Sequence, residues 1–155
     1  QMRNNDGGLL HRYREQEAKI TGNADDYAFF IWSLIELYEA TSEARFFDLA
    51  LELNEYFLAH FYDKERGGFY FTPDNGELLP LRKREIYDGA IPCSNSAAML
   101  NLLRLGRISN RADLERYGVD TANAFSDAVK KMPSAHTFLM CGIEFLLKKD
   151  NICRT

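Results

Sequence analysis

Two apolar stripes with helical spacing, separated by a short break, constrain the fold of this chain more than any other feature. The first begins after Asp25, and its apolar residues recur at steps of three and four: Tyr27, Phe30, Ile31, Leu34, Leu37 and Tyr38. The second follows a break at residues 40–42 and comprises Phe46, Phe47, Ala50, Leu51, Asn54, Phe57, Leu58 and Phe61. Each stripe predicts an amphipathic helix, and so short a link predicts that the two helices form an antiparallel hairpin.

Three more helices are expected, over about residues 95–105, 112–130 and 134–149. Pro133 separates the last two, because proline cannot continue a helix interior. An aromatic run at 67–72 leads into a Pro-Asp-Asn-Gly turn at 73–76 and a short apolar segment. This pattern predicts a small β-hairpin, inserted near residues 68–80, in a chain whose fold class is otherwise all-α.

The distribution of charge separates inner from outer helices. The helix over residues 95–105 is apolar around most of its circumference, so it must be covered on several sides and is expected to be an inner helix. The second and fourth helices keep a charged face, carried by residues such as Asp48 and Asp113, and are expected to lie outside. Alternating inner and outer helices predict stacked antiparallel α-hairpins, as in solenoids and α/α toroids.

Composition argues against several classes of function. The formal net charge of −4 disfavours a nucleic-acid partner. No stretch approaches the roughly 18 to 20 apolar residues that span a membrane, so no membrane association is expected. The widely separated Cys93, Cys141 and Cys153 indicate reduced thiols and a cytoplasmic location. The histidines lie far apart in sequence, so neither a metal site nor another cofactor is predicted.

Two adjacent carboxylates, Asp25 and Asp26, open the first helix. Free backbone N–H groups and the helix dipole stabilise negative charge there, so helix capping is the simplest interpretation of each. Successive helical residues point about 100° apart, so the two carboxylates cannot both face one site. One of them would cap the helix while the other acts as a general acid or base, and the sequence does not say which.

A polar loop over residues 82–96 leads into the apolar third helix and forms the second candidate site. Asp88 in this loop is a candidate general acid or base. Arg82 and Lys83 would neutralise one anionic group of a ligand, and Asn95 would orient its hydroxyl groups. A structural interpretation fits equally well, with Asp88-Gly89 as a turn and either Ser94 or Asn95 as a helix cap.

Side chains of other types offer weaker signals. Tyr27 and Trp32 would present flat surfaces to a sugar, although rings in a helical stripe more often belong to a core. Cys93 precedes a helix start, where a thiol is activated by the helix dipole. No histidine is near it in sequence, so a catalytic or redox cysteine is a minor alternative.

Several of these segments, taken in order, also form a recognisable series. They are Tyr13-Arg14, Gly22, Asp25-Asp26-Tyr27-Ala28-Phe29, Leu37-Tyr38-Glu39-Ala40-Thr41, Gly67-Gly68-Phe69-Tyr70-Phe71-Thr72, Arg82-Lys83, Asp88-Gly89-Ala90-Ile91-Pro92 and Asn95-Ser96. In these motifs, which run over most of its length, the chain resembles part of the DUF255 family, which has YyaL-like and spermatogenesis-associated members. One loop departs from the family's usual Pro-Ser-Gly-Asn-Ser, because Ser94 replaces the glycine and is less free in φ.

In that family a thioredoxin-like domain precedes an (α/α)6 toroid of the six-hairpin glycosidase-like superfamily. The resemblance implies that residues 1–155 form a single partial toroid domain without the thioredoxin-like domain. It also implies a carbohydrate-related function, either binding or epimerase- or glycosidase-like catalysis. The implied catalytic residues are Asp25, Asp26 and Asp88, and those implied to contact a small polar or sugar ligand are Tyr27, Arg82, Lys83, Asn95 and Ser96.

The predicted number of helices limits what the chain does alone. About five helices cannot close a twelve-helix toroid, and an open end leaves apolar surface uncovered. We therefore expect either a longer chain or a homo-oligomer to cover that surface. The alternative function is a non-enzymatic helical scaffold that holds another protein on its concave face.

Overall fold

The computed structural model describes residues 2–148, and most of them lie in helices. The helices are α1 (Ala24–Thr41), α2 (Ala44–Phe61), α3 (Ser94–Ser109), α4 (Ala112–Ala124), α5 (Ser126–Lys131) and α6 (Thr137–Leu147). A 3₁₀ turn, η1 (Pro133–Ala135), precedes α6. Two short strands, β1 (Leu10–Arg14) and β2 (Glu17–Thr21), precede the first helix.

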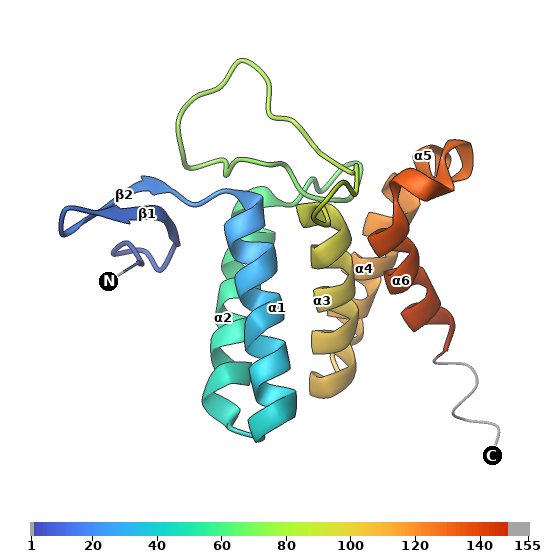
Figure 1. Ribbon diagram of the computed structural model, residues 1–155, viewed down its shortest axis with the longest axis horizontal. Coiled ribbons are helices and arrows are strands. Elements are labelled where there is room, and N and C mark those ends of the chain that lie inside the picture. Colours follow the sequence, from blue (N-terminus) through green and yellow to red (C-terminus); the bar gives the residue numbers. More distant parts are fainter. Residues whose placement is uncertain (1, 149–155) are drawn as a thin grey trace.

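The long helices form two layers of stacked hairpins, as the sequence predicts. Helices α1, α3 and α6 lie side by side and run in the same direction, whereas α2 and α4 run in the opposite direction (Figure 1). Helix α1 packs against α2 and α3, and α3 packs in turn against α4 and α6. The central position of α3 explains its apolar circumference, since 11 of its 16 residues are buried.

An aromatic cluster fills the space between the first hairpin and the segment that follows it. Tyr27 of α1 stacks on Tyr56 and Phe57 of α2, with ring centroids 5.6 and 5.5 Å apart. Phe57 also stacks on Phe69 at 4.3 Å. Burying one such ring contributes about 1.5–3 kcal/mol, so the cluster fixes the segment after α2 against the helices.

The prediction of a β-hairpin at residues 68–80 is wrong. Only a single bridge, Tyr62 to Phe69, forms there, because other groups take the backbone hydrogen bonds of the aromatic run. Tyr70 N–H donates to Phe61 and Phe71 N–H to Lys83, while Phe69 pairs with a side chain.

The hairpin of this fold instead lies before α1, where β1 and β2 pair antiparallel with Leu10 opposite Thr21. Seven of the ten residues in these strands are exposed and four are charged, so no alternation of apolar residues reveals the strands in the sequence.

The predicted helix over residues 112–130 is interrupted. Helix α4 ends at Ala124, and Phe125 leaves the helical conformation with φ −113° and ψ 6° before α5 begins. The ring of Phe125 packs over Gly68, which has φ +76°, and a Cβ there would lie 2.7 Å from that ring. Burial of Phe125 against this glycine therefore accompanies the break.

Candidate functional site

The N-terminal ends of α1, α3 and α6 lie at the same end of their layer, which we call the mouth. The long segment that joins α2 to α3 arches above this end (Figure 1). Asp25 and Asp26 are in the first turn of α1, and Asp88 precedes α3. The two acidic segments that the sequence singles out are thus at one end of the molecule.

Backbone and amide hydrogen bonds tie the arching segment to the helix ends. Phe71 accepts the N–H of Ala24, the first residue of α1, at 2.9 Å. The Asn95 side chain accepts the N–H of Phe69 at 2.7 Å and donates to the carbonyls of Phe69 and Glu85 at 2.9 and 2.7 Å. Asn95 is 1% exposed, so its amide is fully used in holding the segment and offers nothing to a ligand.

The carboxylate of Asp88 joins the arching segment to two helices. It accepts the N–H of Cys93 at 2.9 Å, and those of Phe138 and Leu139, in the first turn of α6, at 2.9 and 3.2 Å. Asp88 is buried, and its negative charge lies at the positive end of the α6 dipole. This arrangement is structural, and an acid or base role for Asp88 stays a prediction.

The structure separates the roles of the two adjacent aspartates. Asp26 belongs to the capping box of Asn23, the N-cap residue, since its carboxylate accepts the backbone N–H of Asn23 at 2.7 Å; it also lies 2.9 Å from Nδ1 of His11. Asp25 is partly exposed and has no hydrogen-bond or ion-pair partner among residues 2–148. Asp25 is therefore the carboxylate of this pair that is available to a ligand.

Helical spacing places Asp25 at the start of a stripe on α1 that continues through Phe29, Trp32 and Glu36. Trp32 contacts Phe138 of α6 with ring centroids 4.8 Å apart, so this stripe faces the side that α1 shares with α6. We call this side the inner face. The sequence marks Trp32 only as one ring in a helical stripe, and the contact with α6 distinguishes it.

Charged groups continue the inner face beyond Trp32. Its indole N–H donates to Glu36 at 2.9 Å, and Arg104 of α3 donates to the same carboxylate oxygen at 2.6 Å. Arg104 also pairs with Glu39 at 2.9 Å. The hydrogen bond from Arg104, aided by that from Trp32, lowers the pKa of Glu36, which is therefore a charged anchor for the indole.

Two of the residues expected to contact a ligand are core residues instead. Tyr27 is 0% exposed, and its hydroxyl accepts the N–H of Leu9 at 2.7 Å. Burial raises the pKa of this phenol. Ser96 is also 0% exposed, and its hydroxyl lies 3.2 Å from the Cys93 sulfur. Neither side chain has free surface in the described part of the chain, and contact of Tyr27 and Ser96 with a ligand stays a prediction.

Arg82 and Lys83, expected to act together, point apart. The Arg82 guanidinium donates to the carbonyls of Thr72 and His60, whereas Lys83 is exposed. Neither side chain contacts Asp25, Asp26 or Asp88 within the described chain. The two basic residues therefore do not form one site with the carboxylates.

The remaining reactive groups give little sign of chemistry. Burial raises the pKa of the Cys93 thiol, opposite to the activation that a helix start favours. No group of three or more metal-ligating side chains occurs among residues 2–148. None of the helices in this part of the chain has the length and apolar character needed to cross a membrane.

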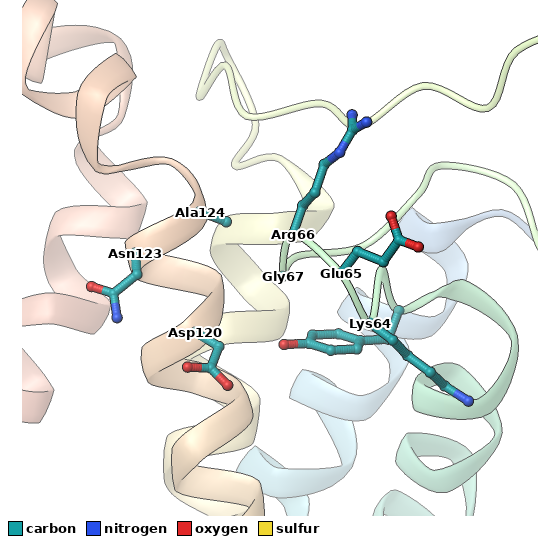
Figure 2. Close-up of a pocket in the computed structure, with 8 residues that line it drawn as sticks. Lys64, Glu65, Arg66, Gly67, Asp120, Asn123 and Ala124 are labelled. Atoms are coloured by element: carbon teal, nitrogen blue, oxygen red, sulfur yellow. The ribbon is translucent and has the colours of Figure 1, made fainter.

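A polar pocket that the sequence does not reveal lies between the ends of α2 and α4. It has a volume of about 340 Å³ and is lined by Lys64, Glu65 and Arg66 on one side and by Asp120 and Asn123 on the other (Figure 2). Burial and the nearby Asp120 raise the pKa of Tyr62 in its wall to about 12. Charges of both signs line this pocket, and none of the predicted site residues belongs to it.

Comparison with known proteins defines the relationships of the chain. No family model matches it. Over 115 residues it is 36% identical to spermatogenesis-associated protein 20 of Rattus norvegicus and, equally, of Homo sapiens. The chain is a homologue of part of spermatogenesis-associated protein 20. The match covers 74% of this chain but only 15% of that protein, so the resemblance concerns one segment of a much longer relative.

Solved structures confirm the toroid fold. A glycoside hydrolase family 76 α-mannanase from Bacteroides thetaiotaomicron superposes with a TM-score of 0.61 at 13% identity, covering 79% of this chain and 32% of that one. A family 76 mannosidase of the same organism gives a TM-score of 0.61 at 18% identity, covering 76% and 31%. The fold is thus part of a glycosidase-like α/α toroid.

Proposed function

We propose that this chain is part of a carbohydrate-binding toroid that holds a sugar on its inner face, with Asp25 as the acid or base group. The observation that carries the proposal is the contrast among the three candidate carboxylates. Asp26 and Asp88 are each held by backbone N–H groups, whereas Asp25 has no partner within residues 2–148. Asp25 also begins the stripe that leads to Trp32.

Two features support a sugar as the ligand. Aromatic rings suit the apolar face of a sugar, and Trp32 lies along the stripe that begins with Asp25. The solved structures of similar fold are named as a mannanase and a mannosidase, which makes mannose oligosaccharides the first ligands to test.

Turnover of a glycoside requires a second carboxylate. Glycosidases commonly use two, separated by about 5 to 10 Å. Asp26 is held in the helix cap and points about 100° away from Asp25, and Asp88 is held by backbone N–H groups at the mouth, so neither supplies that second carboxylate. We therefore expect residues 2–148 to bind the sugar, with a longer toroid supplying full activity.

Calorimetric titration with a mannose disaccharide tests this proposal. Asp25→Asn should weaken binding of the disaccharide about tenfold, because it removes one charge-assisted hydrogen bond between the Asp25 carboxylate and the sugar. Asp48→Asn is the matched control, because Asp48 is an exposed carboxylate on α2. Absence of binding to any mannose oligosaccharide, or equal weakening by both substitutions, would refute the proposal.

A scaffold is the second candidate function, and exposed apolar side chains support it. Phe30 and Leu37 of α1 are 42% and 43% exposed on one flank. On the opposite flank a groove of about 320 Å³ is lined by Val129 of α5 and by Ile143 and Leu146 of α6. We propose that adjoining hairpins of a longer chain cover these flanks, as neighbouring units do in stacked folds.

The oligomeric state distinguishes this assembly from self-association. If adjoining hairpins are the natural cover, light scattering at increasing concentration should show a monomer or non-specific aggregates. A monodisperse dimer that Leu37→Asp dissociates would instead identify a second copy as the cover.

The free thiols of Cys93 and Cys141 support the further proposal of a reducing, cytoplasmic location.

A further inference from the structure

We propose that a pocket formed by Arg66, Arg82 and Arg84 binds a phosphate group. The pocket has a volume of about 430 Å³ and lies where residues 79–84, in the middle of the α2–α3 segment, pass near Tyr70. This pocket is separate from the inner face, and the phosphate proposal does not depend on the proposed carbohydrate function.

The extended backbone at residues 82–84 brings two of the arginines to one side. Lys83 accepts the N–H of Phe71 through its carbonyl, which holds the segment against the aromatic run. In an extended chain alternate side chains point to the same side, so Arg82 and Arg84 line the pocket while Lys83 does not.

Contacts with the protein already fix these two guanidinium groups. Nε and Nη2 of Arg82 donate to Thr72, Nη2 also donates to His60, and the group lies 4.3 Å from the centre of the Tyr70 ring. Nη1 of Arg84 donates to Gly67 at 2.6 Å. Because the side chains are held in place, binding costs little of their conformational entropy.

Both groups still carry unused donors. Nη1 of Arg82, and Nε and Nη2 of Arg84, have no hydrogen-bond partner within residues 2–148. Nε and Nη2 of one guanidinium form the fork that suits two oxygens of a phosphate. The pocket thus presents a fixed set of donors with no protein acceptor.

Arg66 supplies the third positive charge. Its side chain is exposed, has no partner in the described part of the chain, and points away from Asp120, on the opposite side from Lys64 (Figure 2). Arg66 lines both neighbouring pockets, whereas Lys64 and Glu65 line only the pocket of mixed charge. Arg66 is thus free to close on a ligand held by Arg82 and Arg84.

The balance of charge favours a dianion. Among residues 2–148 the one carboxylate paired with these arginines is Asp63, 3.4 Å from Nη1 of Arg84, so two of the three positive charges have no partner in this part of a chain of net charge −4. A phosphate monoester carries about two negative charges at neutral pH. Leu79 and Leu81 form an apolar wall beside the arginines that suits the carbon portion of such an ester.

Calorimetric titration with inorganic phosphate, at constant ionic strength, tests this site. Substituting one arginine that binds phosphate should weaken binding about tenfold, so we expect this loss in Arg66→Gln. Lys64→Gln is the control, since it removes the same charge two residues away without touching the pocket. No saturable binding of phosphate, equal losses in the two variants, or equal affinity for acetate would overturn the proposal.

The source of the phosphate group is resolved by two further probes. Glycerol 3-phosphate represents a soluble ester, and phosphatidylcholine vesicles containing phosphatidic acid present the same group on a membrane. Tighter binding of the soluble ester assigns the site to a small metabolite, whereas Arg66-dependent binding to the vesicles alone assigns it to a lipid headgroup. Failure of both probes would contradict the proposal.

Discussion

Replacing Asp88 with asparagine tests whether this carboxylate holds the mouth together. Its two oxygens accept three backbone N–H groups, one from Cys93 before α3 and two, from Phe138 and Leu139, in the first turn of α6. An asparagine side chain has only one acceptor oxygen. At least one of the three N–H groups would therefore lose its acceptor and face an amide NH₂.

The expected loss of stability follows from these contacts. A hydrogen bond to a charged group contributes about 1.5–3 kcal/mol, and losing the negative charge at the start of α6 removes about 0.3–1 kcal/mol more. We expect Asp88→Asn to lower the free energy of unfolding by about 2–4 kcal/mol. For a chain of this size, 3 kcal/mol corresponds to a fall of about 6–12 °C in Tm.

Urea denaturation followed by circular dichroism measures this change. Asp25→Asn provides the control, because Asp25 has no partner within residues 2–148 and should change stability by less than about 1 kcal/mol. If Asp88→Asn costs less than about 1 kcal/mol, the hydrogen bonds of Asp88 do not hold the mouth and our structural interpretation is wrong.

Three further predictions concern buried groups. Tyr27→Phe should cost about 1–3 kcal/mol by urea denaturation, because the buried Leu9 N–H loses its acceptor, and an unchanged midpoint would refute this. Gly68→Ala should cost at least about 1–2 kcal/mol, since φ is +76° and a Cβ would lie 2.7 Å from the Phe125 ring; wild-type stability would contradict that placement. Burial raises the pKa of Cys93, so at pH 7–8 its thiolate is scarce, and peptide mapping should show native alkylation at least about tenfold slower than at exposed Cys141.

Much of the helical architecture was predictable because it depends on local periodicity. The stripes around Leu34 and Phe57 locate α1 and α2, and the apolar circumference around Leu102 identifies α3 as an inner helix. The break at Phe125 and the irregular path of residues 67–80 were not predictable. Both depend on long-range contacts, in which Gly68 admits the ring of Phe125 and Asn95 takes the hydrogen bonds of Phe69.

The candidate site was predictable only in its location. Either aspartate at a helix start is suited to capping, so the sequence cannot tell which of Asp25 and Asp26 is left available to a ligand. The structure separates them through the Asn23 N–H and the proximity of His11. The arginine pocket was missed for a related reason, because Arg66 is remote in sequence from Arg82 and Arg84.

The fluorescence of Trp32 reports directly on sugar binding at the inner face, because Trp32 is the only tryptophan in the chain and lies on that face. Titration with a mannose disaccharide should give a saturable change in its emission, and Asp25→Asn should shift the midpoint to about tenfold higher concentration. Unchanged emission at concentrations where calorimetry detects binding would place the sugar elsewhere and contradict the account.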